Sequence, residues 1–324
     1  MKIAMMGTGT FAEPTFEALL KAGERVVGLV TQPERDSGAK RGSTRQTGRG
    51  MAAIAAEAGV PTIQPQSINS PEGLEALKSF GADLLVVAAY GQILKPVVIE
   101  AAPLGAINVH ASLLPKYRGA SPIAHAILNG ETTTGVTIIR ITPGLDAGEM
   151  LAKVEVQIHP DETTGELEAR LAPLGANLAL EVIQRMKSGP VSGEKQDPTL
   201  VTKAPKLKKE QGLIDWSESA AKVACRVRAM QPWPTAYSFL HRPGQDPLRL
   251  LIQRTGRIAP TPNPFEIGSL HTLDGIELGV VCGGTEILEI CDLQPAGKKR
   301  QTAAEFLRGY PIRPGAKLDG ENPI

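Results

Sequence analysis

The apolar run over residues 83–88 most constrains what this chain can fold into. Every residue after Asp83 in this run is aliphatic, so it lacks the polar alternation of a strand with one solvent-exposed face. Such a run is typical of a parallel sheet that is covered on both faces. Upstream, a strand over 2–6, a helix over 14–22 and a strand over 25–31 form a βαβ opening. We therefore predict an α/β fold with a Rossmann-like, mostly parallel sheet.

The second half of the chain predicts a different architecture. Residues 190–208 are rich in Gly, Pro and charge, which indicates a linker. Beyond them, short apolar runs separated by turn residues are typical of the strands of a small β-barrel. These runs cover 237–240, 248–252, 275–281 and 287–293. Because 324 residues with 42% hydrophobic content can bury two cores, we expect domains at 1–189 and 209–324, joined by the linker.

Charge, cysteine content and hydropathy exclude several classes of protein. The formal net charge of +1 gives no overall attraction to nucleic acid, so only local clusters of cations are informative. The three cysteines lack Cys-x-x-Cys spacing, which indicates reduced thiols rather than a disulfide framework or a zinc site. The first residues enter a strand directly, leaving no room for a signal peptide, and no apolar run approaches the about 18 residues of a membrane helix. We expect a soluble, cytoplasmic monomer that uses no metal.

Two polar side chains interrupt the predicted strand over 105–110. Asn108 and His110 are two residues apart, so both point to one face of the strand, where an apolar core would accept neither. A later strand, over 136–141, runs into the loop TPGLDAG, which holds Asp146 between two glycines. A strand that breaks its own pattern usually ends at a site. We therefore expect these three side chains, at the ends of two strands, to act together.

This set of side chains suits transfer of a group to or from a carbonyl. A histidine can move a proton near neutral pH, and a carboxylate beside it fixes the tautomer and stabilises the imidazolium. An asparagine amide can donate to an oxygen that becomes negative in a tetrahedral intermediate. No serine or cysteine nucleophile is required, which fits direct attack by a substrate amine. The structural alternative is an Asn/His pair that caps a turn, with the aspartate an ordinary acid of a Gly-rich loop.

The first predicted turn imitates a dinucleotide-binding fingerprint. The run GTGTFA at 7–12 follows the first strand and has the Gly-x-Gly-x-x-Ala spacing. Nicotinamide enzymes place an Asp or Glu after the second strand to hold the ribose, whereas this chain has TQP at 31–33. We interpret the glycines as a tight turn near a substrate, with a nicotinamide-binding protein as the alternative.

Several motifs resemble those of the formyltransferases that use 10-formyltetrahydrofolate. They are NVHASLLP at 108–115, YRG at 117–119, PI at 122–123 and GLDAG at 144–148. Other motifs resemble the methionyl-tRNA formyltransferases within that superfamily and extend the likeness over nearly the whole chain. They are TQP at 31–33, AAYG at 88–91, IDW at 214–216, PWP at 232–234 and QPAGKK at 294–299.

The resemblance implies transfer of a formyl group from 10-formyltetrahydrofolate to the α-amino group of methionyl initiator tRNA, for translation initiation. It implies that the amine attacks the formyl carbon and that Asn108 and His110 stabilise the oxyanion. It also implies that His110, held by Asp146, moves the proton between the amine and the departing folate nitrogen. The residues that it implies for folate binding are Ser112, Leu113, Leu114, Pro115, Tyr90, Gly91, Ile93 and Leu94.

The same resemblance implies an OB-like fold for the C-terminal domain and a tRNA-binding role for basic residues. The expected tRNA contacts come from a basic loop over 35–50, from the linker and from the barrel. These residues are Lys40, Arg41, Arg45, Lys206, Lys208, Lys209, Lys298 and Lys299. Solvated segments would have the same composition, and where relatives carry a Pro-Ser-Pro-Val-Lys type segment this chain has QTGRG at 46–50. The alternatives are a formyltransferase for a nucleotide sugar or glycinamide ribonucleotide, which needs no basic barrel, and an RNA-binding protein without acyl chemistry.

Overall fold

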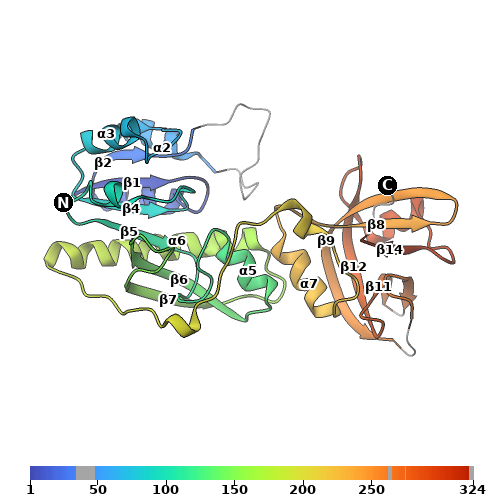
Figure 1. Ribbon diagram of the computed structural model, residues 1–324. Coiled ribbons are helices and arrows are strands. Elements are labelled where there is room, and N and C mark those ends of the chain that lie inside the picture. The colour runs from blue at the N-terminus through green and yellow to red at the C-terminus, as the bar shows by residue number, and fades with distance from the viewer. Residues whose placement is uncertain (34–47, 262–264, 274, 321–324) are drawn as a thin grey trace. The chain divides into compact units, whose positions relative to one another are not determined.

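The computed structural model describes residues 1–33, 48–261, 265–273 and 275–320, and the chain divides into two compact units (Figure 1). The first unit consists of Met1–Ala126, Thr132–His159 and Gly165–Lys206. The second consists of Ile127–Glu131, Pro160–Thr164 and Leu207–Ile324. The domain limits of 1–189, 190–208 and 209–324 stay predictions.

The first unit is built on a seven-stranded sheet in the order β3-β2-β1-β4-β5-β6-β7. Its strands are β1 (Lys2–Gly7), β2 (Arg25–Val30), β3 (Thr62–Ile63), β4 (Leu84–Ala88), β5 (Ala106–His110), β6 (Thr133–Arg140) and β7 (Met150–Gln157). The strands β1 to β5 pair in parallel, whereas β6 and β7 run antiparallel to their neighbours. The sheet confirms the predicted Rossmann-like, mostly parallel architecture. The strand β7 has no counterpart among the predictions, although most of its residues alternate between half-buried and exposed.

Helices connect the parallel strands as the βαβ pattern predicts. They are α1 (Glu13–Lys21), α2 (Met51–Glu57), α3 (Pro71–Ser79) and α4 (Pro96–Ile99). The helix α5 (Pro122–Leu128) connects β5 to β6, and α6 (Thr164–Ser188) follows β7. The start of α3 shows how local sequence sets a boundary. The Ser70 hydroxyl accepts a hydrogen bond from the Gly73 backbone N–H, and Pro71 occupies the first helical turn, where its missing N–H costs nothing.

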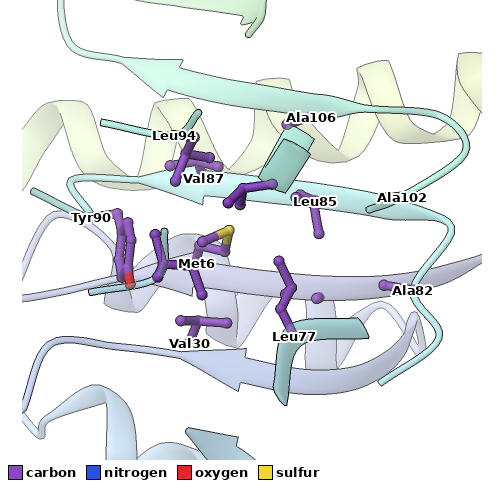
Figure 2. Packing of buried hydrophobic residues seen from close by; sticks show 13 residues of the cluster. Met6, Val30, Leu77, Ala82, Leu85, Val87, Tyr90, Leu94, Ala102 and Ala106 are labelled. Carbon is purple, nitrogen blue, oxygen red and sulfur yellow. The ribbon is translucent and has the colours of Figure 1, made fainter. Parts of the chain in front are cut away.

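The core beside β4 follows from the apolar run that dominates the sequence. All five residues of β4 are buried. Figure 2 shows Leu85 and Val87 of this strand beside Met6 of β1 and Val30 of β2, with Leu77 of α3 packed onto the same cluster. The strand β4 is the central strand of the sheet, and because all of its side chains are buried, both of its faces are covered, as its lack of polar residues predicts.

Asn108 and His110 lie on the face of β5 that is not covered by α6. A Cβ added at Gly175 of α6 would lie 2.7 Å from Val109 Cγ1, so α6 packs closely against the face to which Val109 points. Successive side chains alternate across a strand, so Asn108 and His110 point to the opposite face. On that opposite face the polypeptide forms loops, and these loops carry the site.

The second unit contains antiparallel strands in the order β10-β11-β12-β9-β8-β14, with β13 paired to β12 (Figure 1). The strands are β8 (Ala236–Arg242), β9 (Gln245–Pro260), β10 (Leu270–Leu273), β11 (Ile276–Cys282), β12 (Glu286–Pro295), β13 (Gln301–Thr302) and β14 (Lys317–Asp319), and the helices are α7 (Ala220–Ala229) and α8 (Ala303–Gly309). An antiparallel bridge joins Ser269, next to β10, to Lys317 of β14. This bridge connects the two outer strands, so the sheet closes on itself and confirms the predicted small barrel.

Candidate active site

His110 lies at the end of β5 with only 5% of its surface exposed, and both of its ring nitrogens face oxygen atoms. Its Nε2 is 3.0 Å from the Tyr117 carbonyl oxygen, and its Nδ1 is 3.7 Å from Asp146 Oδ2. A carbonyl oxygen can only accept, so Nε2 carries a proton and donates. This hydrogen bond fixes the ring and directs Nδ1 toward the carboxylate. The structure thus brings together two of the three predicted catalytic residues.

Asp146 reaches His110 because its loop folds back over the sheet. The pairs Ile107–Arg140 and His110–Thr137 show that β6 runs antiparallel to β5, so β6 ends beside the start of β5. Asp146 itself has a left-handed φ of 46°, and its Oδ2 accepts a hydrogen bond of 2.8 Å from the Gly119 backbone N–H. The carboxylate is therefore held by a second loop as well as by its own.

Glycine at position 148 permits this folded loop. A Cβ at Gly148 would collide with the carbonyl oxygen of Arg140, where the chain leaves β6 and returns to β7. The backbone N–H of Arg140 also donates to the Glu149 carbonyl at 3.0 Å, which closes the base of the loop. A larger residue at 148 would open this base and move Asp146.

Asn108 points to the same face of β5 as His110 and is partly exposed. Among the residues that the structure describes, its side chain has no hydrogen-bond partner. Its amide N–H groups are therefore free to donate to a bound oxygen, in contrast to His110 and Asp146, which the protein itself holds. The catalytic role of the three residues stays a prediction.

A segment that the sequence indicated as linker forms part of this site. We call residues 194–204 the strap. The strap pairs with Met150 at one end and with Arg118 at the other. Its Gln196 contacts the loop of Asp146, and its Thr202 Oγ1 accepts a hydrogen bond of 2.8 Å from the Tyr117 backbone N–H. A Gly- and Pro-rich composition carries no periodic signal, so nothing in the sequence could have identified these contacts.

A hydrogen bond and buried side chains fix the conformation of the predicted folate-binding turn, residues 112–115. Ser112 is fully buried, and its hydroxyl donates a hydrogen bond of 2.7 Å to the Lys116 carbonyl. Leu114 is buried against Ile139 and Met150. Leu113 and Pro115 are only partly buried. The turn thus rests on β6 and β7, and its contact with a folate stays a prediction.

The other predicted folate-binding residues divide between core and surface. The Tyr90 ring lies beside Met6 and Val30 in the core with 2% of its surface exposed (Figure 2), and burial raises the pKa of its hydroxyl to about 12. That hydroxyl has no hydrogen-bond partner among the described residues. Leu94 is also buried, whereas Gly91 is exposed and Ile93 is 76% exposed. Ile93 is therefore the apolar member that solvent can reach.

The loop that carries Ile93 has a fixed backbone. Asn69 Nδ2 donates 2.8 Å to the Ile93 carbonyl, and Asn69 Oδ1 accepts from the Lys95 backbone N–H at 2.9 Å. Gln32 Nε2 donates 3.1 Å to the Tyr90 carbonyl. Leu145, in the loop of Asp146, is likewise an exposed apolar residue, at 59%.

Three of the predicted tRNA-binding cations, Lys40, Arg41 and Arg45, lie outside the described residues. The others are all exposed, namely Lys206, Lys208, Lys209, Lys298 and Lys299. Lys298 Nζ lies 5.4 Å from the centre of the Tyr310 ring. Their contact with tRNA stays a prediction.

In the part of the chain that the structure describes, no group of three or more His, Cys, Asp or Glu side chains is arranged to hold a metal ion. Within the same ranges, no helix combines the length and the apolar character that crossing a membrane requires.

Comparison with known proteins identifies the family. The chain matches the family described as Formyl transferase over residues 1–183 and that described as Formyl transferase, C-terminal domain, over residues 206–311. It is 44% identical over 318 residues to the methionyl-tRNA formyltransferase of Citrifermentans bemidjiense, covering 98% of this chain and 96% of that protein. It is 42% identical over 318 residues to the methionyl-tRNA formyltransferase of Solibacter usitatus, covering 98% of each.

Solved structures share the fold at lower sequence identity. A sugar 3N-formyl transferase, determined in the presence of dTDP and 5-N-formyl-THF, aligns with a TM-score of 0.64 at 16% identity, covering 92% of this chain and 99% of that one. A methionyl-tRNA formyltransferase from Clostridium thermocellum aligns with a TM-score of 0.55 at 16% identity, covering 79% and 93%. With both family patterns and relatives above 40% identity along nearly its full length, the chain belongs to the formyl transferase family, in the group of the methionyl-tRNA formyltransferases.

Proposed function

We propose that this protein transfers a formyl group from 10-formyltetrahydrofolate to the α-amino group of methionyl initiator tRNA, for translation initiation. The observation that carries the proposal is the pair His110–Asp146, with 3.7 Å between Nδ1 and Oδ2, on the same sheet face as the free amide of Asn108. The names of relatives more than 40% identical over nearly the whole chain support the same donor class and acceptor.

The residues present fit a folate donor. A pterin is a flat heteroaromatic ring whose faces stack on apolar surface and whose edges carry hydrogen-bonding groups, so such a ligand needs an apolar wall and fixed backbone groups. Ile93 and Leu145 supply exposed apolar surface, and the backbone around Ile93 is held in place by Asn69. When bound, the donor supplies a formyl carbon attached to a nitrogen that can leave.

The roles of the protein groups follow from what each can donate or accept. The α-amine forms the new bond to the formyl carbon while the bond to the donor nitrogen breaks. The Asn108 amide donates to the formyl oxygen as negative charge develops there. His110 Nδ1 takes the proton that the amine loses and returns a proton to the departing nitrogen.

The His110–Asp146 geometry suits this proton transfer. A separation of 3.7 Å exceeds a hydrogen bond, so the carboxylate does not occupy Nδ1 as a hydrogen-bond partner. The carboxylate is still close enough to stabilise the ring when it becomes positive. The hydrogen bond from Nε2 to the Tyr117 carbonyl keeps the ring oriented through the cycle.

We further propose that the acceptor is held by the exposed cations of the linker and barrel, because phosphate binding needs accessible Lys or Arg side chains. These are the predicted residues Lys206, Lys208, Lys209, Lys298 and Lys299. The predicted residues Lys40, Arg41 and Arg45, which lie outside the described residues, complete the proposed set. The proposed substrate is a tRNA of translation, so we place the reaction in the cytoplasm. We also expect a monomeric enzyme.

The test is formyl transfer measured with charged tRNA. Wild-type protein is incubated with 10-formyltetrahydrofolate and methionine-charged initiator tRNA, and formylmethionine is quantified by mass spectrometry after deacylation. Charged elongator methionine tRNA is the matched control. We expect product on the initiator alone. Equal product on both tRNAs would contradict the proposed acceptor, and absence of product on both would contradict the proposed function.

A further inference from the structure

We propose that Gln196 is a positioning residue for the reaction, because its side chain fixes the loop that presents Asp146 to His110. Its carboxamide Nε2 donates to the Asp146 carbonyl at 2.7 Å and to the Gly148 carbonyl at 2.8 Å. Its Oε1 accepts from Arg118 Nε at 3.0 Å and from Arg118 Nη2 at 2.8 Å. This inference rests on the proposed function for its kinetic part and on geometry alone for its structural part.

The four contacts leave one orientation for the Gln196 amide. Two carbonyl oxygens can only accept, so the nitrogen must face the loop of Asp146. A guanidinium can only donate, so the oxygen must face Arg118. The side chain is therefore a cross-link between two loops, and no other residue type supplies two donors and an acceptor in this geometry without changing its length.

The strap that carries Gln196 is itself anchored on both sides of it. Glu194 and Met150 exchange backbone hydrogen bonds of 2.9 and 2.8 Å. At the other end, the Arg118 N–H donates 2.9 Å to the Thr202 carbonyl, and the Arg118 carbonyl accepts 2.8 Å from the Ala204 N–H. Gln196 thus projects from a backbone that is fixed against the sheet and the 117–121 loop.

The two residues that contact the His110 ring both have left-handed backbone, which the strap holds in place. Tyr117, whose carbonyl accepts from Nε2, has φ of 63°, and Asp146, whose carboxylate faces Nδ1, has φ of 46°. Left-handed backbone costs free energy for a bulky residue such as tyrosine and less for an aspartate, and in both loops the surrounding contacts hold the backbone in this conformation. The strap supplies those contacts, through Thr202 to the first residue and through Gln196 to the second.

Gln196→Glu removes the hydrogen-bond donor of the side chain and keeps its size and shape. Glutamate has the same shape and keeps an acceptor for Arg118, but it turns a carboxylate oxygen toward two carbonyl oxygens. The contact with Arg118 should therefore survive, whereas the hold on residues 146–148 should be lost. Lys195→Ala is the matched control, since Lys195 is the neighbouring strap residue and its side chain is exposed.

Hydrogen–deuterium exchange of the full-length protein without substrate measures the structural part. We expect amides of residues 142–149 to exchange at least about tenfold faster in Gln196→Glu than in wild type, because a lost anchor opens the loop locally. We expect no change in Lys195→Ala. Unchanged exchange in Gln196→Glu would overturn the inference whether or not the protein formylates tRNA.

Steady-state kinetics on methionyl initiator tRNA measure the functional part. We expect Gln196→Glu to lower kcat by about 10- to 100-fold, since a displacement near 1 Å costs that much, with the KM of both substrates changed less than about twofold. In protein that already carries Asp146→Asn, adding Gln196→Glu should not lower kcat further. An equal loss in both backgrounds, or a loss confined to KM, would overturn the positioning role. Altered exchange with an inactive wild type would refute the proposed function alone.

Discussion

Replacing Asp146 by Asn tests the proposed mechanism most directly, because it removes one charge and little else. Oδ2 of Asp146 both accepts from the Gly119 N–H at 2.8 Å and faces His110 Nδ1 at 3.7 Å. An asparagine oxygen can still accept from Gly119, and asparagine tolerates the left-handed φ of 46° at this position. We therefore expect the variant to fold normally.

The magnitude follows from the charge separation. At 3.7 Å and an effective dielectric of about 20, a carboxylate stabilises a positive imidazole ring by about 4 kcal/mol. His110 is 5% exposed and the Asp146 side chain 14%, so solvent screens this interaction little. Because each 1.4 kcal/mol is about tenfold in rate, Asp146→Asn should lower kcat by about a thousandfold.

The assay is steady-state formylation of methionyl initiator tRNA, with thermal unfolding measured on the same preparations. Asp246→Asn is the matched control, since Asp246 is an exposed aspartate of β9 and its change should leave kcat unchanged. Asp146→Ala should lower the melting temperature more than Asp146→Asn, because it also leaves the Gly119 N–H without its acceptor. A kcat for Asp146→Asn within tenfold of wild type would refute the electrostatic role.

Three further changes test the surroundings of the site and the barrel. Gly148→Ala should lower the free energy of unfolding by about 1 to 3 kcal/mol through overpacking and should lower kcat, and a normal melting temperature would contradict the proposed loop geometry. Tyr90→Phe should keep or raise stability by up to about 1 kcal/mol, since the hydroxyl is buried without a partner, and a raised KM for the folate donor would show instead that it contacts the ligand. Burial raises the pKa of the Asp292 carboxyl, but hydrogen bonds from Arg254 and Arg300 outweigh it and hold that pKa below its ordinary value. The folded pKa lies below the unfolded one, so this contribution is present above about pH 4 and is lost as the pH falls through the folded pKa. Asp292→Asn should therefore cost about 1 to 2 kcal/mol in denaturant unfolding at pH 7, and this cost should shrink as the pH falls below about 4; a cost that does not change with pH would contradict the ion-pair origin.

Strands that a short run of apolar residues marks could be predicted from the sequence. The run Leu84–Ala88 forms a central buried strand, and the predicted strands of the second unit form a barrel. The strand β7 was missed even though most of its residues alternate, and nothing in its sequence sets the direction of β6 against β5. Strand direction depends on the length and path of a connection, which periodicity does not encode.

The sequence also identified the chemical groups of the candidate site, but not how they are held. The spacing of Asn108 and His110 places them on one face, because the two-residue period of a strand is a property of the backbone itself. The contact of Tyr90 with a folate stays a prediction, and the structure adds that the Tyr90 ring lies in the core beside Met6. A tyrosine at a strand end can point either way, and only the packing of its neighbours decides between them.

The sequence by itself thus determined the fold class, the family and the residue types of the site, since these depend on local pattern and motif. Only the tertiary structure decided that Asp146 reaches His110 by folding back over an antiparallel strand, and that a strap read as linker fixes it. The contacts responsible join Gly119 to Asp146, Asp146 to Gln196, and Arg118 to Gln196, across 27, 50 and 78 positions of sequence. Hydrogen bonds over such separations exist only when the chain is folded, because they depend on distance in space and leave no periodic trace in the sequence.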